Sequence, residues 1–338
     1  MTHDQTQKRE ESMGSEARRR SRERLRQQRE KDQRAAARKR GLTVALIAVG
    51  VVALVVGVGY VILNLDSSGA DYDGGLAPQT LQADGSVVMA EPGAQAPVVE
   101  VYADYQCPAC RQFELLNGDL LQEKAALGEA IVQFRPVSIF ARQPEPISGN
   151  SLRAGAAARA AADHGVFVQY NDLLFENQPT EGSEGFTPQQ LKELFAETDA
   201  PEGAAAGFDE RVDAEAETVD RFTGEFLPAL TADAVEEFGQ DEVAAMPLTD
   251  LLDWGADNGH DPSFLEGTYT GETIEATGNA YTRYSGENAF RATPSVYING
   301  ELLDNTTTMT VRGLRGAIDD AAPGEVETEP LTDGGGTD

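Results

Sequence analysis

The chain contains 338 residues with a formal net charge of −30, and its two cysteines are Cys107 and Cys110. The charge is unevenly divided, because residues 1–40 carry 14 Lys and Arg against 7 Asp and Glu. Residues 41–63 carry no charge, so residues 64–338 hold the remaining 13 basic and 50 acidic residues, a net charge of −37. Such acidity argues against nucleic acid or anionic lipid as a partner of this larger portion, since both are polyanions.

The run from Gly41 to Leu63 is 23 residues long and apolar on every face. As a helix with a rise of about 1.5 Å per residue, it spans a hydrocarbon core of about 30 Å. A cleaved signal peptide would have a shorter apolar run and a small-residue cleavage site. Because flanking basic residues stay in the cytoplasm, we predict a basic cytoplasmic segment at 1–40 and an uncleaved, single-pass transmembrane anchor at 41–63. A flexible linker at 64–85 then leads to an extracytoplasmic domain.

The two cysteines lie where a predicted strand is followed by a predicted helix. Residues 98–103 are rich in β-branched and aromatic side chains, and residues 111–127 carry apolar side chains at helical spacing. This places Cys107 at a helix N-terminus, where unpaired N–H groups and the helix dipole stabilise a thiolate. A thiol with a lowered pKa suits disulfide exchange. Pro108 fits the first helical turn, where a missing N–H leaves no gap.

Three other interpretations of the cysteine pair are less consistent with the sequence. A structural disulfide across so short a loop would stabilise little, and idle buried thiols do not account for a CxxC at a strand–helix junction. A zinc site needs four ligands, and the histidines His3, His164 and His260 are not at ligand spacing. His164 and His260 are predicted to be turn residues without a catalytic role. We therefore predict a redox-active pair that uses no metal and no cofactor.

The remaining elements are predicted from hydrophobic periodicity and turn residues. Asn299-Gly300 is a strong two-residue hairpin signal, and Val311, Leu314 and Ile318 lie on one face of the last predicted helix. Two further strands are predicted at 86–89 and 130–137, and a mostly helical region at 151–284. A hairpin is predicted at 295–303, a final helix from 310 onward, and a disordered acidic tail at 322–338.

Two motifs together resemble the DsbA-like branch of the thioredoxin fold. One is Cys107-Pro108-Ala109-Cys110, and the other is the Ala-Thr-Pro-Ser-Val-Tyr-Ile-Asn-Gly stretch around Pro294. Residues 174–179, Leu-Phe-Glu-Asn-Gln-Pro, also resemble that branch. The resemblance implies an α/β thioredoxin-like domain at 86–321, with a helical insertion at about 140–290.

The resemblance also implies roles for individual residues. Cys107 and Cys110 are the catalytic pair, supported by Pro108, Ala109 and a cis Pro294 that faces the disulfide. The backbone of Thr293 is implied to pair with the substrate chain, as an extended peptide pairs with a strand.

Two features depart from the family pattern. A buried acid often lies six residues before the first cysteine, where this chain has Val101, and Glu100 points to the opposite face of the strand. No buried proton acceptor is therefore assigned. Asp104 and Glu114 are taken as exposed, screened charges that oppose the thiolate, with Arg111 available to offset them. The acidic helical portion near 200–245 is longer than expected and has no predicted role.

These features predict an enzyme, a membrane-tethered protein thiol:disulfide oxidoreductase that introduces disulfides into cysteine-containing secreted proteins. A membrane redox partner would regenerate the disulfide, and the oxidising direction is favoured because structural disulfides form outside the cytoplasm. A Cys107 pKa of about 5 to 6.5 is expected. The alternatives are an extracytoplasmic reductase, for instance in cytochrome maturation, and a non-catalytic thioredoxin-like binding module.

Overall fold

The computed structural model describes residue 72 and residues 74–328. The predicted basic segment and anchor at 1–63 lie outside the described residues, as do the start of the linker and the last ten residues of the predicted tail. Within the described part, no helix is both long and apolar enough to cross a membrane.

The core of the fold is a six-stranded mixed sheet in the order β1-β2-β4-β3-β5-β6. β3 and β4 are parallel, and the other neighbouring pairs are antiparallel. A parallel pair requires a crossover connection, which the helix after the cysteine motif supplies. The strands are β1 (Gln79–Leu81), β2 (Val87–Met89), β3 (Val98–Ala103), β4 (Ile131–Pro136), β5 (Ser295–Ile298) and β6 (Glu301–Leu302).

The central strand β3 is buried on both faces, as its β-branched and aromatic sequence predicts. Val99 and Val101 point into the main apolar core, which helix α2 (Pro108–Ala126) covers. Tyr102 points to the other face, where it packs with Ala280 of helix α10 (Tyr269–Arg283). The sheet is therefore enclosed by helices on both sides, and β3 delivers the cysteine motif to its end.

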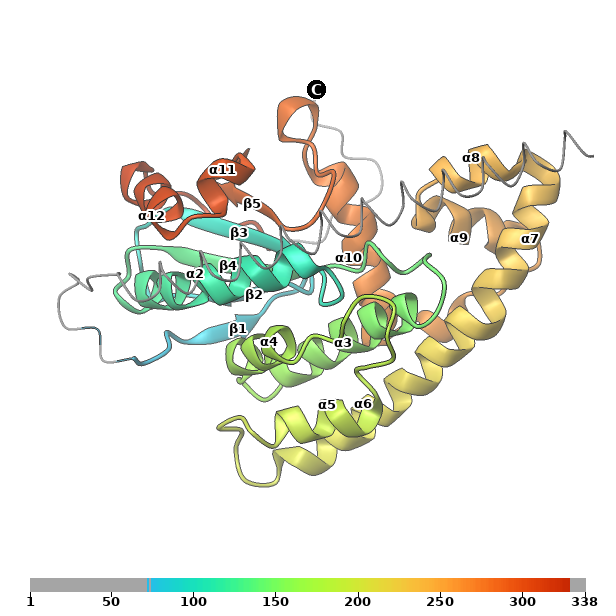
Figure 1. Cartoon of the computed structure of the whole chain (residues 1–338), viewed down its shortest axis with the longest axis horizontal. Coiled ribbons are helices and arrows are strands. Elements are labelled where there is room, and N and C mark those ends of the chain that lie inside the picture. The colour runs from blue at the N-terminus through green and yellow to red at the C-terminus, as the bar shows by residue number, and fades with distance from the viewer. Residues whose placement is uncertain (1–71, 73, 329–338) are drawn as a thin grey trace, which may run out of the picture. The chain divides into compact units, whose positions relative to one another are not determined.

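The helical insertion lies between β4 and β5 and contains a second apolar core. Helix α6, the π-turn η1 and α7 follow one another as the long yellow rod in Figure 1. Phe222, Leu230 and Leu251 belong to the second core, which joins α7 and α9 to α10 through Ile274. The elements are α3 (Ile147–Ala162), α4 (Phe167–Glu176), α5 (Pro188–Phe195), α6 (Ala204–Arg221), η1 (Phe222–Phe226), α7 (Leu227–Phe238), α8 (Gln240–Ala245), α9 (Leu248–Asp257), η2 (Ser263–Leu265), α10, and then η3 (Gly286–Asn288).

The C-terminal hairpin forms where the sequence predicts it. Asn299 and Gly300 have positive φ angles of 50° and 81°, the left-handed conformation that a two-residue hairpin turn needs. The last helix, α12 (Val311–Asp320), begins after Thr310, whose side chain accepts a hydrogen bond from the Gly313 N–H at 3.1 Å. A short helix not predicted from the sequence, α11 (Asn305–Thr308), precedes it.

Two predicted boundaries were wrong within the described residues. Residues 79–81 of the predicted linker form β1, which pairs with β2. The first residues of the predicted disordered tail are also ordered against the sheet: the Gly324 N–H donates to the Ala96 carbonyl at 3.1 Å, and the Glu327 carbonyl accepts from Arg135 at 2.9 Å. The first segment is ordered by a local hairpin with β2, closed by the hydrogen bond from the Gln82 N–H to the Ser86 carbonyl, and the second is ordered by contacts with residues far away in the chain.

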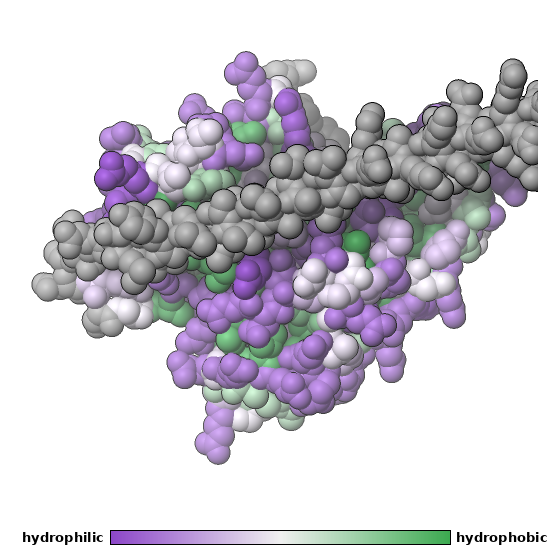
Figure 2. Space-filling view, in the orientation of Figure 1, coloured by the Kyte–Doolittle hydropathy of each residue, from purple (hydrophilic) through white to green (hydrophobic). Residues whose placement is uncertain are grey.

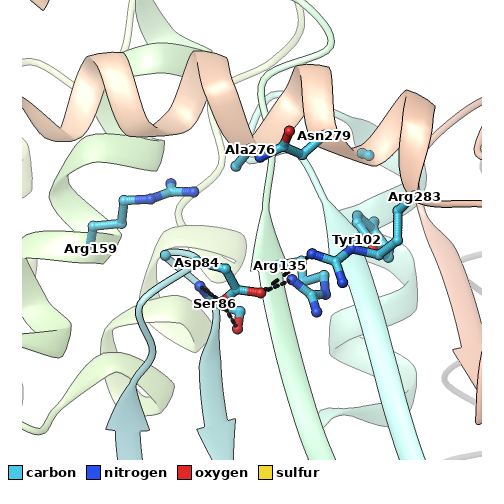
Figure 3. A pocket seen from close by; sticks show the side chains of 10 residues that line it. Asp84, Ser86, Tyr102, Arg135, Arg159, Ala276, Asn279 and Arg283 are labelled. Carbon is cyan, nitrogen blue, oxygen red and sulfur yellow. Dashed lines mark hydrogen bonds and ion pairs between the residues drawn. The ribbon is translucent and has the colours of Figure 1, made fainter. Parts of the chain in front are cut away.

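A buried ionic cluster lies beside the sheet and encloses a cavity of about 10 Å³, room for about one water molecule. Arg135 contacts Asp84 at 2.5 Å and Glu100 at 2.7 Å. Figure 3 shows Arg159 of α3 approaching Asp84 from one side, with Arg135 and Arg283 on the other. Neither cysteine lines this cavity, so we interpret the cluster as structural. The face shown in Figure 2 is largely hydrophilic, in agreement with the acidic composition.

Candidate active site

The cysteine pair opens helix α2, as predicted. Cys107 is the N-cap residue with extended backbone angles, and Pro108 occupies the first helical turn. The N–H groups of Cys110 and Arg111 both donate to the Cys107 carbonyl, at 3.1 and 3.2 Å. Both thiols are free in the structure. Cys107 retains 6% exposure and Cys110 is fully buried, so an incoming partner can reach Cys107 alone.

The environment moves the two thiol pKa values in opposite directions. The hydrogen bond from the Cys110 thiol is the largest cause that lowers the pKa of Cys107 to about 6. The hydroxyl of Thr293 and the N–H groups of Cys110 and Ala109 lower it further, against the effect of burial. Burial raises the pKa of Cys110 well above its usual value. Cys107 is therefore a thiolate at neutral pH, and Cys110 keeps its proton.

Thr293 and Pro294 meet the cysteines through the antiparallel pairing of β5 with β3. The peptide bond between them is cis, the geometry that the family resemblance implies. The Cys107 sulfur lies 3.4 Å from the Thr293 carbonyl oxygen, to which it donates a hydrogen bond only while the thiol is protonated. The Thr293 hydroxyl is buried and forms no well-aligned hydrogen bond with any group of residues 74–328, but it acts on Cys107 at close range and lowers the pKa of that thiol. This contribution of the side chain was not predicted from the sequence, which indicated only the backbone.

The helical insertion contributes a further residue to the site. The side-chain amide of Gln178 donates to the carbonyls of Tyr105 and Cys107, at 2.9 and 3.0 Å. Gln106 donates to the Pro179 carbonyl at 3.2 Å. The segment that resembles the family at 174–179 therefore holds the loop before α2 in place. The sequence pattern identified this segment but gave Gln178 no role.

Arg111 does not reach the thiolate. Its side chain donates to the carbonyls of Phe175 and Glu176, at 2.9 and 3.3 Å. These carbonyls are at the end of α4, where the helix dipole is negative and a cation is stabilising. Arg111 therefore joins α2 to the insertion, and the expectation that it offsets nearby acidic charge at Cys107 was wrong.

The two acidic residues taken as exposed charges are buried. Asp104 is fully buried and Glu114 is 6% exposed. Burial raises the pKa of Asp104 to about 7 and that of Glu114 well above its usual value. Glu114 accepts a hydrogen bond from Asn171 at 2.9 Å, on the α4 side of the helix. Solvent therefore does not screen these two carboxyl groups. Local sequence could not reveal their burial, because the burial depends on how the helical insertion packs against the loop and α2.

Glu100 lies on the face opposite Val101, as the strand alternation predicts, and its carboxylate binds Arg135 and Tyr284. His164 follows α3 in a turn, and His260 contacts Asp233 at 2.9 Å near the end of α9.

Among residue 72 and residues 74–328, no group of three or more His, Cys, Asp or Glu side chains could hold a metal ion. The roles of Pro108 and Ala109 in supporting the site stay predictions.

The fold and the motif define a thioredoxin-like protein. The family model described as Thioredoxin matches residues 83–320, and the chain belongs to this family. A search of curated proteins found no relative.

Several solved structures are similar at low identity. MdbA, a thiol-disulfide oxidoreductase from Actinomyces oris, has 17% identity and a TM-score of 0.44, covering 78% of this chain and 96% of that one. MdbA from Corynebacterium diphtheriae has 19% identity and a TM-score of 0.42, with coverages of 73% and 98%. Reduced DsbA from Mycobacterium tuberculosis has 20% identity and a TM-score of 0.40, with coverages of 74% and 95%.

Proposed function

We propose that this protein is a membrane-tethered, extracytoplasmic thiol-disulfide oxidoreductase that oxidises the thiols of secreted proteins through Cys107 and Cys110. The observation that carries the proposal is the division between the two thiols. The pKa of Cys107 is lowered to about 6, whereas that of fully buried Cys110 is raised. A stabilised thiolate favours the reduced form of the pair and so makes its disulfide a stronger oxidant.

In the oxidising direction, a substrate thiolate attacks Cys107 Sγ and displaces Cys110 as the leaving group. The Cys107–Cys110 bond breaks, a mixed disulfide forms with the substrate, and Cys110 takes up a proton. A second substrate thiolate then attacks the substrate sulfur of the mixed disulfide and releases Cys107 as a thiolate. The substrate loses two electrons and the pair gains them. A membrane redox partner would reoxidise Cys107 and Cys110 and complete the cycle.

The direction of electron flow is tested by the reduction potential. Equilibration of the full chain with glutathione buffers should give a potential of roughly −120 to −200 mV, above the value of about −270 mV for thioredoxin. The oxidised protein should also form disulfides in a reduced, unfolded substrate. A potential near that of thioredoxin would instead support the reductase. Binding of a partner that persists when both cysteines are replaced, without exchange activity, would support the binding module.

The roles of the two thiols are tested separately. Cys107 should be alkylated quickly at pH 7 and Cys110 slowly, because the thiolate is the reacting species and Cys110 is buried. The Cys110→Ala protein should accumulate mixed disulfides at Cys107. Equal alkylation rates, or adducts found only on Cys110, would reverse the assignment.

The membrane tether is the part of the proposal that depends on sequence alone. The uncharged run at 41–63 follows a basic segment with a net charge of +7, which supports an anchor with a cytoplasmic N-terminus. External protease added to spheroplasts should digest the domain after residue 64 and spare a tag at Met1. A protected domain, or a mature protein that begins after residue 63, would contradict this topology.

A further inference from the structure

The helical insertion reaches the backbone of Cys107 itself. The Cys107 carbonyl accepts the N–H groups of Cys110 and Arg111, at 3.1 and 3.2 Å, and the side-chain amide of Gln178, at 3.0 Å. Of these three donors, only Gln178 comes from outside the cysteine motif and its helix, 71 residues further along the chain. The same amide also donates to the Tyr105 carbonyl at 2.9 Å. The insertion therefore holds a backbone group of the reacting residue.

The orientation of this carbonyl determines where the Cys107 sulfur lies. The carbonyl and the side chain share one Cα, so rotation about ψ moves the sulfur relative to the start of α2. Cys107 has a φ of −84° and a ψ of 116°, and its N–H donates to the Asp104 carbonyl at 3.0 Å, which restrains φ. Pro108 disfavours a helical ψ at the residue before it but leaves a broad extended range open. The hydrogen bond from Gln178 narrows that range to the ψ at which the first N–H groups of α2 reach the sulfur.

Gln106, directly before the first cysteine, makes a second connection to the insertion. Its side chain is fully buried. The Gln106 amide donates to the Pro179 carbonyl at 3.2 Å, and its side-chain oxygen accepts from the Asn150 amide at 2.6 Å. The Asn150 amide also donates to the Ser183 carbonyl at 2.9 Å. The loop before α2 and residues 178–183 thus each donate side-chain hydrogen bonds to the backbone of the other.

The segment that carries Gln178 is itself closely packed, so it can serve as a fixed support. A Cβ atom at Gly185 would lie only 2.5 Å from the Pro179 side chain, which shows how tightly the segment closes on itself. The Ser183 N–H donates to the Thr180 carbonyl at 2.9 Å within the same turn. Phe186, at the end of the segment, is 2% exposed and belongs to the main apolar core. The position of Gln178 is therefore set by the core of the protein.

We propose that Gln178 and Gln106 are positioning residues, through which the helical insertion fixes the backbone of Cys107 and keeps its sulfur at the start of α2. This inference rests on the proposed exchange at Cys107 and Cys110, and it gives the insertion a part in that chemistry. Both glutamines act through the backbone of the motif. Because that backbone is held in place in advance, little reorganisation is needed when the Cys107 sulfur reacts.

The test compares Gln178→Met, which keeps the length of the side chain and removes its N–H donors, with Gln189→Met at an exposed glutamine of α5. Titration of the thiolate absorbance of the reduced full-length proteins gives the Cys107 pKa. It should rise by about half a unit to one unit in Gln178→Met, the effect of about one lost hydrogen bond, and stay unchanged in Gln189→Met. The equilibrium with glutathione should then favour the disulfide of Gln178→Met by about threefold to tenfold more than that of the wild type.

These two measurements distinguish a positioning role from a purely structural one. Loss of the hydrogen bonds lowers the stability to urea in either case, but only a displaced sulfur changes the titration of a protein that is still folded. Gln106→Met removes the contacts with Pro179 and Asn150 and should shift the Cys107 pKa in the same direction. It carries the test if Gln178→Met does not fold.

The outcomes separate this inference from the proposed function. A wild-type Cys107 that titrates near the ordinary thiol pKa of about 8.5 contradicts the proposed function itself. A wild-type pKa near 6 that is unchanged in both Gln178→Met and Gln106→Met overturns only the positioning role. A Gln178→Met protein that loses stability but keeps the wild-type pKa and glutathione equilibrium also overturns it, because its contacts are then structural alone. An equal pKa shift in Gln189→Met would overturn it as well.

Discussion

The free energy of unfolding of the reduced protein should depend on pH, because Cys107 is a thiolate in the folded state. In the folded protein the pKa of Cys107 is lowered from 9.0 to about 6, so the folded state releases this proton at lower pH than the unfolded chain. A group whose folded pKa is depressed stabilises the folded state fully above its unfolded pKa. The contribution is lost as the pH falls from about 9 to about 6.

The magnitude follows from these two values. A single site with a folded pKa of about 6 and an unfolded pKa of about 9 adds about 2.6 kcal/mol to the free energy of unfolding between pH 5 and pH 8. Cys110 adds nothing in this window, because its raised pKa leaves it protonated in both states. The reduced Cys107→Ala protein lacks the titrating thiol but keeps the other groups, so the difference between the two proteins isolates the Cys107 contribution.

The assay is urea denaturation of the reduced wild-type and Cys107→Ala proteins at several pH values between 5 and 8. The stability difference, wild type minus variant, should increase by about 2 to 3 kcal/mol across this range. The oxidised wild-type protein serves as a control, because it has no thiolate at Cys107 and should lack this increase. A difference that changes by less than about 0.5 kcal/mol would refute the argument that the fold stabilises the thiolate.

Three substitutions test the surroundings of the site and the ionic cluster. Thr293→Val keeps the side-chain shape but removes the hydroxyl. Titration of the thiolate absorbance should then show the Cys107 pKa raised by about half to one unit, equivalent to about 0.7 to 1.4 kcal/mol. An unchanged pKa would exclude a contribution from the hydroxyl. Gln178→Ala leaves two loop carbonyls without their donor and should lower the free energy of unfolding by about 1 to 3 kcal/mol. Gln189→Ala, at an exposed position, is the control, and equal losses would contradict the role of Gln178. Arg135→Ala removes the cation of buried Glu100 and leaves Asp84 only the longer contact with Arg283, at 3.6 Å. It should cost about 3 to 5 kcal/mol in the same denaturation assay, whereas a loss below about 1 kcal/mol would mean that water reaches the cluster.

Local sequence determined the elements that carry the chemistry. The CxxC pair before an amphipathic helix, the hairpin dipeptide Asn299-Gly300 and the apolar spacing of the last helix each act through residues a few positions apart, and the structure places the corresponding elements where these signals predict. Strand alternation also placed Glu100 and Val101 on opposite faces. Such signals are readable because backbone geometry alone fixes the spacing at which side chains share a face.

The burial of charged and polar groups was decided by tertiary structure. Asp104 and Glu114 look like ordinary surface acids in sequence, yet α3 and α4 of the insertion cover them and change their pKa values. Gln178 lies 71 residues from Cys107 along the chain, and nothing local indicates that it holds the loop before α2. The free energy of a buried charge depends on every group packed around it. Those groups come from distant segments, so only the folded chain determines which of these acids are buried and which way their pKa values move.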